Sequence, residues 1–301
     1  MREILLGGKK VNDSSPAYVI AEIGHNHQGS VETCKRLFDA AKDAGCDAVK
    51  LQKRDNKHLY SPEMYHAPYN SENAFGPTYG KHREALEFDK AQYELLKAYA
   101  ESIGLVFCAT AFDIPSLLFL ARINVPIIKI ASGDLSNEAL LREAAKVGIP
   151  VIFSTGGAEA KSVIAAHEIL VGVPHAILQC TSGYPAKYDE LNLRVIETYR
   201  EMFRNSVIGW SGHDTGISMA LVAYALGARI IEKHFTLDRS WKGTDQAMSL
   251  EPKGMANMIE NLTLAYLSLG TGVKKQYESE IEPLKKQRKN KHGQVDGQTA
   301  A

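Results

Sequence analysis

The chain has 301 residues, of which 45% are hydrophobic and 23% are charged, a balance that excludes a disordered or fibrous protein and suits one large globular domain. Basic and acidic residues number 35 each, so net charge gives no reason to expect nucleic acid or a membrane surface as a partner. The N-terminus lacks the apolar stretch of a signal peptide, and no apolar run is long enough for a membrane span.

The spacing of the four cysteines, Cys34, Cys46, Cys108 and Cys180, matches neither a zinc site nor a disulfide framework. Cys108 and Cys180 lie in apolar runs, where a free cysteine acts as a small core residue. Free thiols are typical of a reducing compartment, so we expect a cytoplasmic protein.

The first predicted element is a β-hairpin over residues 3–12 that turns at Gly7 and Gly8. Short apolar runs rich in Val and Ile then predict eight buried parallel strands. These runs are Ala17–Gly24, Asp47–Gln52, Leu105–Phe112, Pro126–Ser132, Pro150–Gly156, His175–Ser182, Ser206–His213 and Ala228–Thr236.

Amphipathic segments between these runs predict helices. The clearest are one capped by Ser30 that runs to Ala44, Asp89–Ile103, Asn137–Val147 capped by Ser136, and 252–269. Eight parallel strands alternating with helices predict a (β/α)8 TIM barrel, with the hairpin covering its floor. The alternative is a doubly wound open sheet, but its usual G-x-G-x-x-G sequence is absent.

Two segments depart from the alternation. Residues 53–88 form a long polar and aromatic connection, which we expect to act as a substrate lid. Residues 1–272 would be the barrel, and residues 273–301 a polar tail with the basic run KKQRKNKH, which we expect to be disordered. Nucleic-acid binding by this run is the alternative.

Polar residues recur where the predicted strands end, and in a barrel these ends converge on one mouth. Lys50 and Lys129 lie inside otherwise apolar strands, where a buried ammonium group needs an anion. A shared anionic ligand would meet this need, and structural ion pairs with Glu22 or Asp134 are the alternative.

His213 and His234 end neighbouring strands, which lie about 4.8 Å apart in a sheet. Two neutral imidazoles there could bind one manganese, zinc or cobalt ion, which would act as a Lewis acid on a carbonyl group. The alternative is that both are hydrogen-bonded core or loop residues.

Small polar residues complete the mouth. Thr110, Ser132, Ser154 and Ser211 offer hydroxyl groups, which together with the two lysines predict a cradle for phosphate or carboxylate. A metal beside an anion cradle suits carbon–carbon bond formation between a phosphorylated or carboxylated nucleophile and an aldehyde.

These residues lie in segments that resemble the sialic acid synthase family. The segments are AEIGHNHQGS at 21–30, DAVKLQ at 47–52, CATAFD at 108–113, VPIIKIASGDL at 125–135, PVIFSTGG at 150–157, LQCTSGYP at 178–185, IGWSGHD at 208–214 and IIEKHFTLDRSWKGTDQAMSL at 230–250. The resemblance implies a transferase that condenses phosphoenolpyruvate with N-acetylmannosamine or a related N-acyl hexosamine and releases phosphate. It also implies that this enzyme is a homodimer.

The resemblance also implies roles for individual residues. His213 and His234 would hold manganese. Phosphoenolpyruvate would be held by Lys50, Thr110, Lys129, Ser132, Ser154 and Ser211. The sugar and the site's organisation would depend on Glu22, Gln52, Tyr184 and Asp245, with Asp134 near the reacting atoms. Glu22, Asp134 and Lys129 are therefore the predicted catalytic residues.

The sequence departs from the family in three places. Asp134 stands where glutamate is expected, and Ser182 where asparagine is common. The family's C-terminal antifreeze-like module, which supplies an arginine to a neighbouring subunit, does not follow the barrel here.

Three other functions stay open at this stage. They are a 3-deoxy-octulosonate type of phosphoenolpyruvate synthase, a Schiff-base aldolase that uses Lys129 or Lys50, and a barrel that binds a ligand without catalysis.

Overall fold

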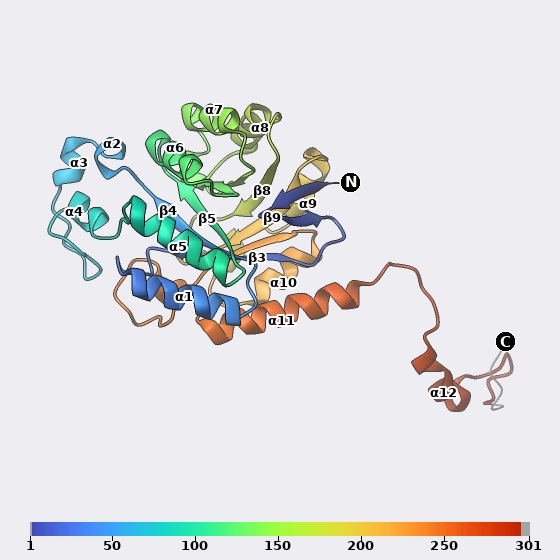
Figure 1. The fold of residues 1–301 in the computed structure, drawn as a ribbon. Coiled ribbons are helices and arrows are strands. Elements are labelled where there is room, and N and C mark those ends of the chain that lie inside the picture. The colour runs from blue at the N-terminus through green and yellow to red at the C-terminus, as the bar shows by residue number, and fades with distance from the viewer. Residues whose placement is uncertain (1, 296–301) are drawn as a thin grey trace. The chain divides into compact units, whose positions relative to one another are not determined.

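The computed structural model describes residues 2–295, and the chain divides into two compact units, Met1–Tyr266 and Leu267–Ala301. The first unit is a closed barrel of parallel strands in the order β10-β3-β4-β5-β6-β7-β8-β9 (Figure 1). Its strands are β3 (Tyr18–Gly24), β4 (Ala48–Lys53), β5 (Val106–Ala111), β6 (Ile128–Ile130), β7 (Val151–Ser154), β8 (His175–Cys180), β9 (Val207–Gly212) and β10 (Ile230–His234). The predicted TIM barrel is confirmed.

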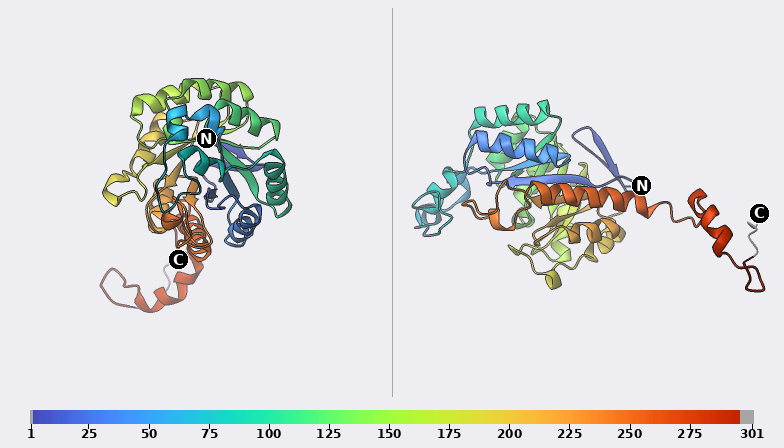
Figure 2. Two further views of the ribbon diagram at one scale, coloured as in Figure 1. Left: turned by 90° about the vertical axis from the view of Figure 1, so that its left-hand side faces the viewer. Right: turned by 90° about the horizontal axis from the view of Figure 1, so that it is seen from below.

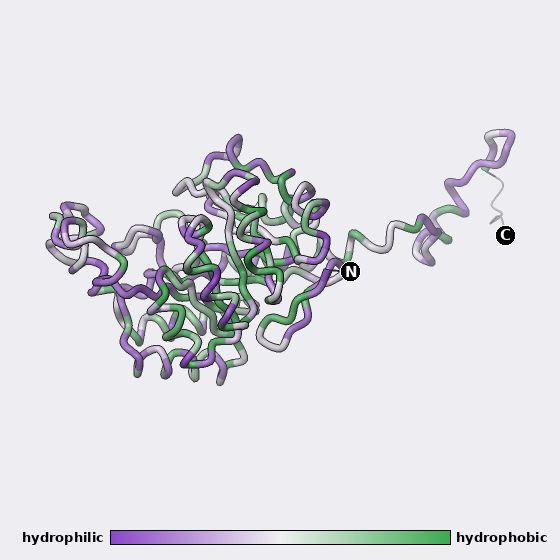
Figure 3. The backbone as a smooth tube through the Cα atoms, turned by 90° about the horizontal axis from the view of Figure 1, so that it is seen from above, coloured by the Kyte–Doolittle hydropathy of each residue, from purple (hydrophilic) through white to green (hydrophobic). Residues whose placement is uncertain are grey.

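Helices connect the strands and surround the barrel (Figure 2). They are α1 (Val31–Asp43), α5 (Lys90–Ser102), α6 (Ile114–Arg122), α7 (Glu138–Val147), α8 (Ala160–Ile169), α9 (Val195–Met202), α10 (Ser218–Ala225) and α11 (Pro252–Leu269). Outward-facing strand residues such as Val49 and Phe107 pack on helix residues such as Phe38 in one continuous core. Full burial of each large apolar side chain contributes about 1.5–3 kcal/mol. Figure 3 shows apolar segments inside the barrel unit and polar ones outside.

Two local predictions were wrong in detail. Helix α7 is capped by Asn137, not Ser136, because the Asn137 side chain accepts a hydrogen bond from the Leu140 amide at 3.2 Å. Strand β6 is shorter than the predicted run Pro126–Ser132, because the chain turns into the 3-10 helix η1 (Ser132–Asp134). Polar residues of the mouth thus follow some strands instead of ending them.

The predicted N-terminal hairpin is confirmed, with β1 (Glu3–Leu6) paired antiparallel to β2 (Lys9–Asn12). Gly7 and Gly8 have φ of 55° and 87°, the left-handed values that a tight hairpin turn requires. Leu6 and Val11 pack in a second core with barrel residues at the starts of strands, including Tyr18 and Ile230. The hairpin therefore closes the N-terminal end of the barrel.

The connection between β4 and α5 is more regular than the sequence suggested. It contains the short helices α2 (Asn56–Leu59), α3 (Pro62–His66) and α4 (Tyr79–Glu84), each capped by a side chain. Figure 1 shows these helices at the end of the barrel opposite the hairpin, which is the end where the strands finish.

The predicted tail also contains a helix, α12 (Glu278–Gln287), which the sequence pattern did not indicate. The last part of the predicted tail, residues 296–301, lies outside the described residues. Across residues 2–295, no helix combines the length and the apolar character needed to cross a membrane.

Candidate active site

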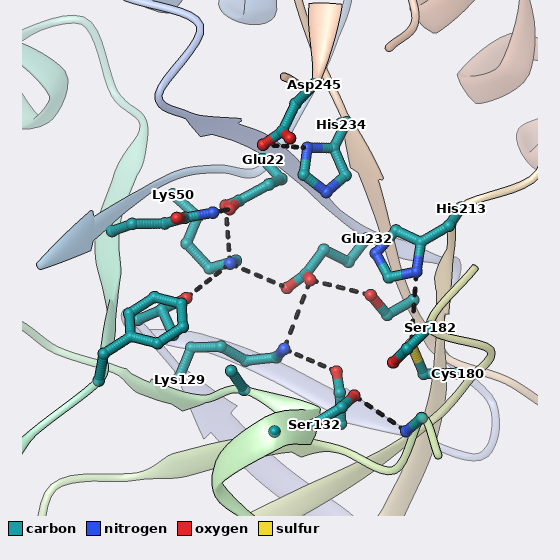
Figure 4. A pocket seen from close by; sticks show the side chains of 18 of the residues that line it. Glu22, Lys50, Lys129, Ser132, Cys180, Ser182, His213, Glu232, His234 and Asp245 are labelled. Carbon is teal, nitrogen blue, oxygen red and sulfur yellow. Dashed lines mark hydrogen bonds and ion pairs between the residues drawn. The ribbon is translucent and has the colours of Figure 1, made fainter. Parts of the chain in front are cut away.

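The C-terminal ends of the barrel strands enclose a cavity of about 400 Å³, at the end where barrel enzymes place their active sites (Figure 4). Every predicted site residue except Asp134 lines it. These lining residues are Glu22, Lys50, Gln52, Thr110, Lys129, Ser132, Ser154, Tyr184, Ser211, His213, His234 and Asp245.

Strand register explains why these residues meet. Gln52 on β4 lies beside Thr110 on β5, and Thr110 lies beside Lys129 on β6. On the other side of the barrel, His234 of β10 lies beside Glu22 of β3. Because side chains alternate between the two faces of a strand, neighbours in register that face inward form a continuous belt.

A buried network of lysines and carboxylates forms the floor of the cavity (Figure 4). The Lys50 ammonium lies 2.7 Å from Glu22 Oε2 and donates to Thr110 Oγ1 at 2.8 Å. The Lys129 ammonium donates to Ser154 Oγ at 2.6 Å. Both lysines also face Glu232, at 3.7 Å from Lys50 and 3.4 Å from Lys129.

Each of these two lysines therefore pairs with a carboxylate of the protein itself. This agrees with the alternative prediction of structural ion pairs in the case of Glu22, which pairs with Lys50. Glu232 was not among the predicted site residues. It could have been found, because it lies two positions before His234 on the same strand and so shares its inward face.

The protonation of this network follows from its charges. Burial lowers the pKa of Lys50, but Glu22 and Glu232 outweigh it and raise that pKa overall. Burial dominates at Lys129 and lowers its pKa. Burial also disfavours the charged form of Glu232, yet Lys129 and Lys50 hold its pKa down at about 2. Glu232 is thus ionised at neutral pH.

Beside the floor, backbone and hydroxyl groups form a narrow cradle. The Gly156 amide donates to Ser132 Oγ at 2.9 Å. A Cβ atom at position 156 would lie 2.1 Å from Ser182 Oγ and 3.1 Å from Cys180 Sγ, so any larger residue would have to displace the Ser182 hydroxyl group. This close approach of backbone to hydroxyl groups suits an oxyanion ligand.

The two histidines lie together on the opposite wall, with ring centroids 5.4 Å apart. His213 shares a hydrogen bond of 2.9 Å from Nδ1 to the Thr181 carbonyl, which puts its proton on Nδ1 and leaves the Nε2 lone pair free. Burial lowers the pKa of His213 to about 3, so this ring is neutral at pH 7. His234 Nδ1 is buried without a hydrogen bond, 3.7 Å from Asp245 Oδ2.

Comparison with known proteins decides the family. A model described as the NeuB family matches residues 37–274. The human N-acetylneuraminate-9-phosphate synthase is 39% identical over 272 residues, which cover 90% of this chain and 76% of that protein. The chain belongs to the NeuB family.

Other relatives support the same assignment. The N,N'-diacetyllegionaminic acid synthase of Legionella pneumophila is 35% identical over 91% of this chain and 79% of its own length. The solved N-acetylneuraminic acid (sialic acid) synthetase of Leptospira borgpetersenii superposes with a TM-score of 0.80 at 36% identity, covering 94% of this chain and 95% of that one. These three relatives of the NeuB chain are thus enzymes that make sialic and related acids.

The donor atoms of this NeuB chain fit a divalent metal in part. Within residues 2–295 no group of three or more histidine, cysteine or acidic side chains is arranged to hold a metal. Two imidazoles do face the cavity, and the Asp245 carboxylate lies behind His234 Nδ1, as a carboxylate often does behind a metal-bound histidine. His213 and His234 would therefore supply two ligands, and substrate or water the others.

Asp134 is the one predicted catalytic residue of the NeuB chain that does not line the cavity. Helix η1 presents Ser132 and Gly133 to the cavity instead. Burial raises the pKa of Asp134 to about 6, against a lowering effect of its hydrogen bond with Asn137.

Sequence reasoning also missed a cationic wall of the cavity. Arg54 follows β4, Arg83 belongs to α4, and His25 follows β3, and all three line the cavity. The two arginines lie in the connection after β4, where the sequence shows no periodic pattern that would mark a residue as inward-facing.

Proposed function

We propose that this chain condenses phosphoenolpyruvate with an N-acyl hexosamine and releases inorganic phosphate, with a divalent metal as cofactor, for which the ligand chemistry favours Mn2+. The observation that carries the proposal is one cavity that joins an oxyanion cradle with two lysines to a pair of neighbouring imidazoles. The NeuB membership supports the same chemistry.

The lysine floor would bind the donor substrate. Lys129 and Ser154 are within hydrogen-bond reach of one another, and Ser132 lies across the cradle from them, so all three can turn toward one phosphate group. Lys50 and Thr110 would take the carboxylate at the other end. Ser211 donates to Glu232 at 3.0 Å and would keep this carboxylate facing the lysines.

The reaction balances without an oxidant. Carbon 3 of phosphoenolpyruvate attacks the aldehyde carbon of the open-chain sugar, and water adds at carbon 2. The resulting tetrahedral intermediate loses phosphate by cleavage of its C–O bond. A metal bound by His213 and His234 would supply Lewis-acid polarisation of the aldehyde oxygen. The fixed positive charges of Lys50 and Lys129 favour the phosphate that leaves.

Glu22 and its neighbours would orient the sugar. Glu22 accepts a hydrogen bond from Gln52 at 2.7 Å and pairs with Lys50, which holds its carboxylate in one place. The Tyr184 ring lies tilted against His213, with ring centroids 4.2 Å apart, and lines that side of the cavity. Asp245 would face the sugar hydroxyl groups from the His234 side.

The test is phosphate release from phosphoenolpyruvate with Mn2+, using N-acetylmannosamine, its 6-phosphate and related N-acyl hexosamines, with and without chelator. Release that needs both a sugar of this class and the metal supports the proposal. Chelator-insensitive turnover with borohydride trapping of Lys129 or Lys50 would replace it with a Schiff-base aldolase. Binding of phosphoenolpyruvate with no release for any sugar would favour a barrel without catalysis.

Two further parts of the proposal concern the setting of the enzyme. All four cysteines are unpaired and buried, which suits a reducing compartment such as the cytoplasm. A homodimer stays a prediction, which light scattering of the purified protein would test.

A further inference from the structure

The cationic wall, formed by Arg54, Arg83 and His25, offers its two guanidinium groups few hydrogen-bond acceptors and no carboxylate partner within residues 2–295. Arg54 is buried, and its guanidinium stacks on Phe112 with 3.6 Å between the Cζ atom and the ring centroid. It donates to Gln52 Oε1 at 2.8 Å. Arg83 donates twice to the Tyr79 hydroxyl, at 3.2 and 2.9 Å. Across residues 2–295, neither guanidinium forms an ion pair with a carboxylate.

The carboxylates nearest to the wall already have other partners. Glu87 lies 2.8 Å from the Lys53 ammonium, and Asp245 faces His234 at 3.7 Å. The wall therefore differs from the lysine floor, where Glu22 and Glu232 face Lys50 and Lys129 directly. A buried guanidinium, Arg54, and a half-buried one, Arg83, without a paired anion are costly, and such groups persist in proteins mainly where a ligand supplies that anion.

The ring of His25 lies between the two arginines, and its two nitrogen atoms offer too few acceptors for both guanidinium groups. Arg54 Nη1 lies 3.1 Å from His25 Nε2, and Arg83 Nη1 lies 3.3 Å from His25 Nδ1. Burial and the flanking arginines lower the pKa of His25 well below its usual value, so the ring is neutral. A neutral imidazole carries one N–H and one lone pair, so it can accept from only one guanidinium.

One arginine therefore faces an N–H group of His25, donor against donor. An oxyanion at this wall would accept from both guanidinium groups, and from the His25 N–H once that ring turns toward it. Arginine is well suited to this task, because its planar fork matches phosphate and carboxylate oxygens.

The wall is separate from the proposed phosphoenolpyruvate floor. Gln52 accepts from Arg54 on one side and donates to Glu22 on the other, and Glu22 in turn pairs with Lys50. An anion at the wall is thus divided from an anion on the floor by a neutral amide and a carboxylate. The cavity can hold one oxyanion at each end.

We propose that Arg54, Arg83 and His25 form a second anion subsite that binds a terminal phosphate ester of the acceptor sugar. This inference rests on the proposed function and specifies its substrate class: an N-acyl hexosamine 6-phosphate in preference to the free sugar. The aldehyde at C1 and the phosphate at C6 lie at opposite ends of the open chain, so one molecule can reach both the histidine wall and the arginine wall.

The test compares kcat/KM for N-acetylmannosamine 6-phosphate and for N-acetylmannosamine, in phosphate release from phosphoenolpyruvate with Mn2+. The wild-type protein should prefer the phosphorylated sugar by about a hundredfold or more, the range expected for charge-assisted contacts to a buried dianion. Arg83→Met and, separately, Arg54→Met should each reduce this ratio by at least about tenfold. Lys57→Met removes one exposed positive charge from the same connection outside the cavity and should leave the ratio unchanged.

The outcomes separate the two claims. Comparable kcat/KM for both sugars in the wild-type protein overturns the second anion subsite and leaves the synthase assignment standing. This wild-type comparison needs no variant to fold. An equal ratio in wild type and Arg83→Met, with a strong preference in both, would place the phosphate elsewhere and also overturn the subsite. No turnover of any N-acyl hexosamine, free or phosphorylated, refutes the proposed function itself.

Discussion

Glu232 is the residue on which the charge balance of the cavity floor depends, and Glu232→Gln tests this directly. Its carboxylate lies 3.4 Å from the Lys129 ammonium and 3.7 Å from that of Lys50. At an effective dielectric constant of about 20, Coulomb's law gives attractions of about 5 and about 4.5 kcal/mol for these pairs. The cost of burying the carboxylate offsets much of this attraction.

An amide side chain at position 232 would keep the shape but leave two buried ammonium groups with Glu22 alone. Removing one partner of a buried ion pair costs about 3–5 kcal/mol. We expect Glu232→Gln to lower the free energy of unfolding by this amount at pH 7, measured by urea unfolding of chelator-treated protein. Glu197→Gln, an exposed change on α9, is the control and should stay within about 0.5 kcal/mol of wild type.

The loss should also depend on pH. Burial already lowers the pKa of Lys129 in the folded protein, and loss of Glu232 lowers it further. A lysine with a depressed folded pKa loses stability as pH falls, because the folded state must accept a proton that the unfolded state holds more readily. The deficit should therefore be larger at pH 6 than at pH 9. A loss below about 1 kcal/mol at pH 7, or no pH dependence, would refute the described network.

Three further predictions concern single residues. His213→Ala should abolish activity and weaken Mn2+ binding, measured by calorimetry, by at least about tenfold. The control His58→Ala changes an exposed histidine and should leave both activity and Mn2+ binding intact. Full activity in His213→Ala would refute the metal assignment. Lys129→Met should weaken phosphoenolpyruvate binding by about ten- to a hundredfold, with exposed Lys146→Met as control; equal affinity would argue against the anion cradle. Asp134→Asn should raise the free energy of unfolding by about 1 kcal/mol at pH 8 but not at pH 4. The pKa of Asp134, raised to about 6, means that the folded state disfavours the ionised carboxylate above that pH, and solvent screening of this partly exposed group keeps the effect small. An equal effect at both pH values would contradict the burial of this carboxyl group.

The sequence alone determined the barrel and most of its mouth. Runs of Val and Ile followed by amphipathic segments define parallel strands and their helices, since both faces of each strand must be buried. The polar residues at the strand ends then converge for topological reasons, because all parallel strands of a closed barrel finish at one end. Lys50, Lys129 and His234 were found in this way, and the structure places all three in one cavity.

The tertiary structure alone decided which charges face one another. Whether a buried lysine meets an external anion or a protein carboxylate depends on the register of neighbouring strands, and here it brings Glu232 between Lys50 and Lys129. The short turn of η1 keeps Asp134 off the cavity lining. Arg54 and Arg83 lie in the segment between β4 and α5, whose sequence has no regular hydrophobic pattern. Only the folded path of this segment shows that both guanidinium groups reach the ring of His25.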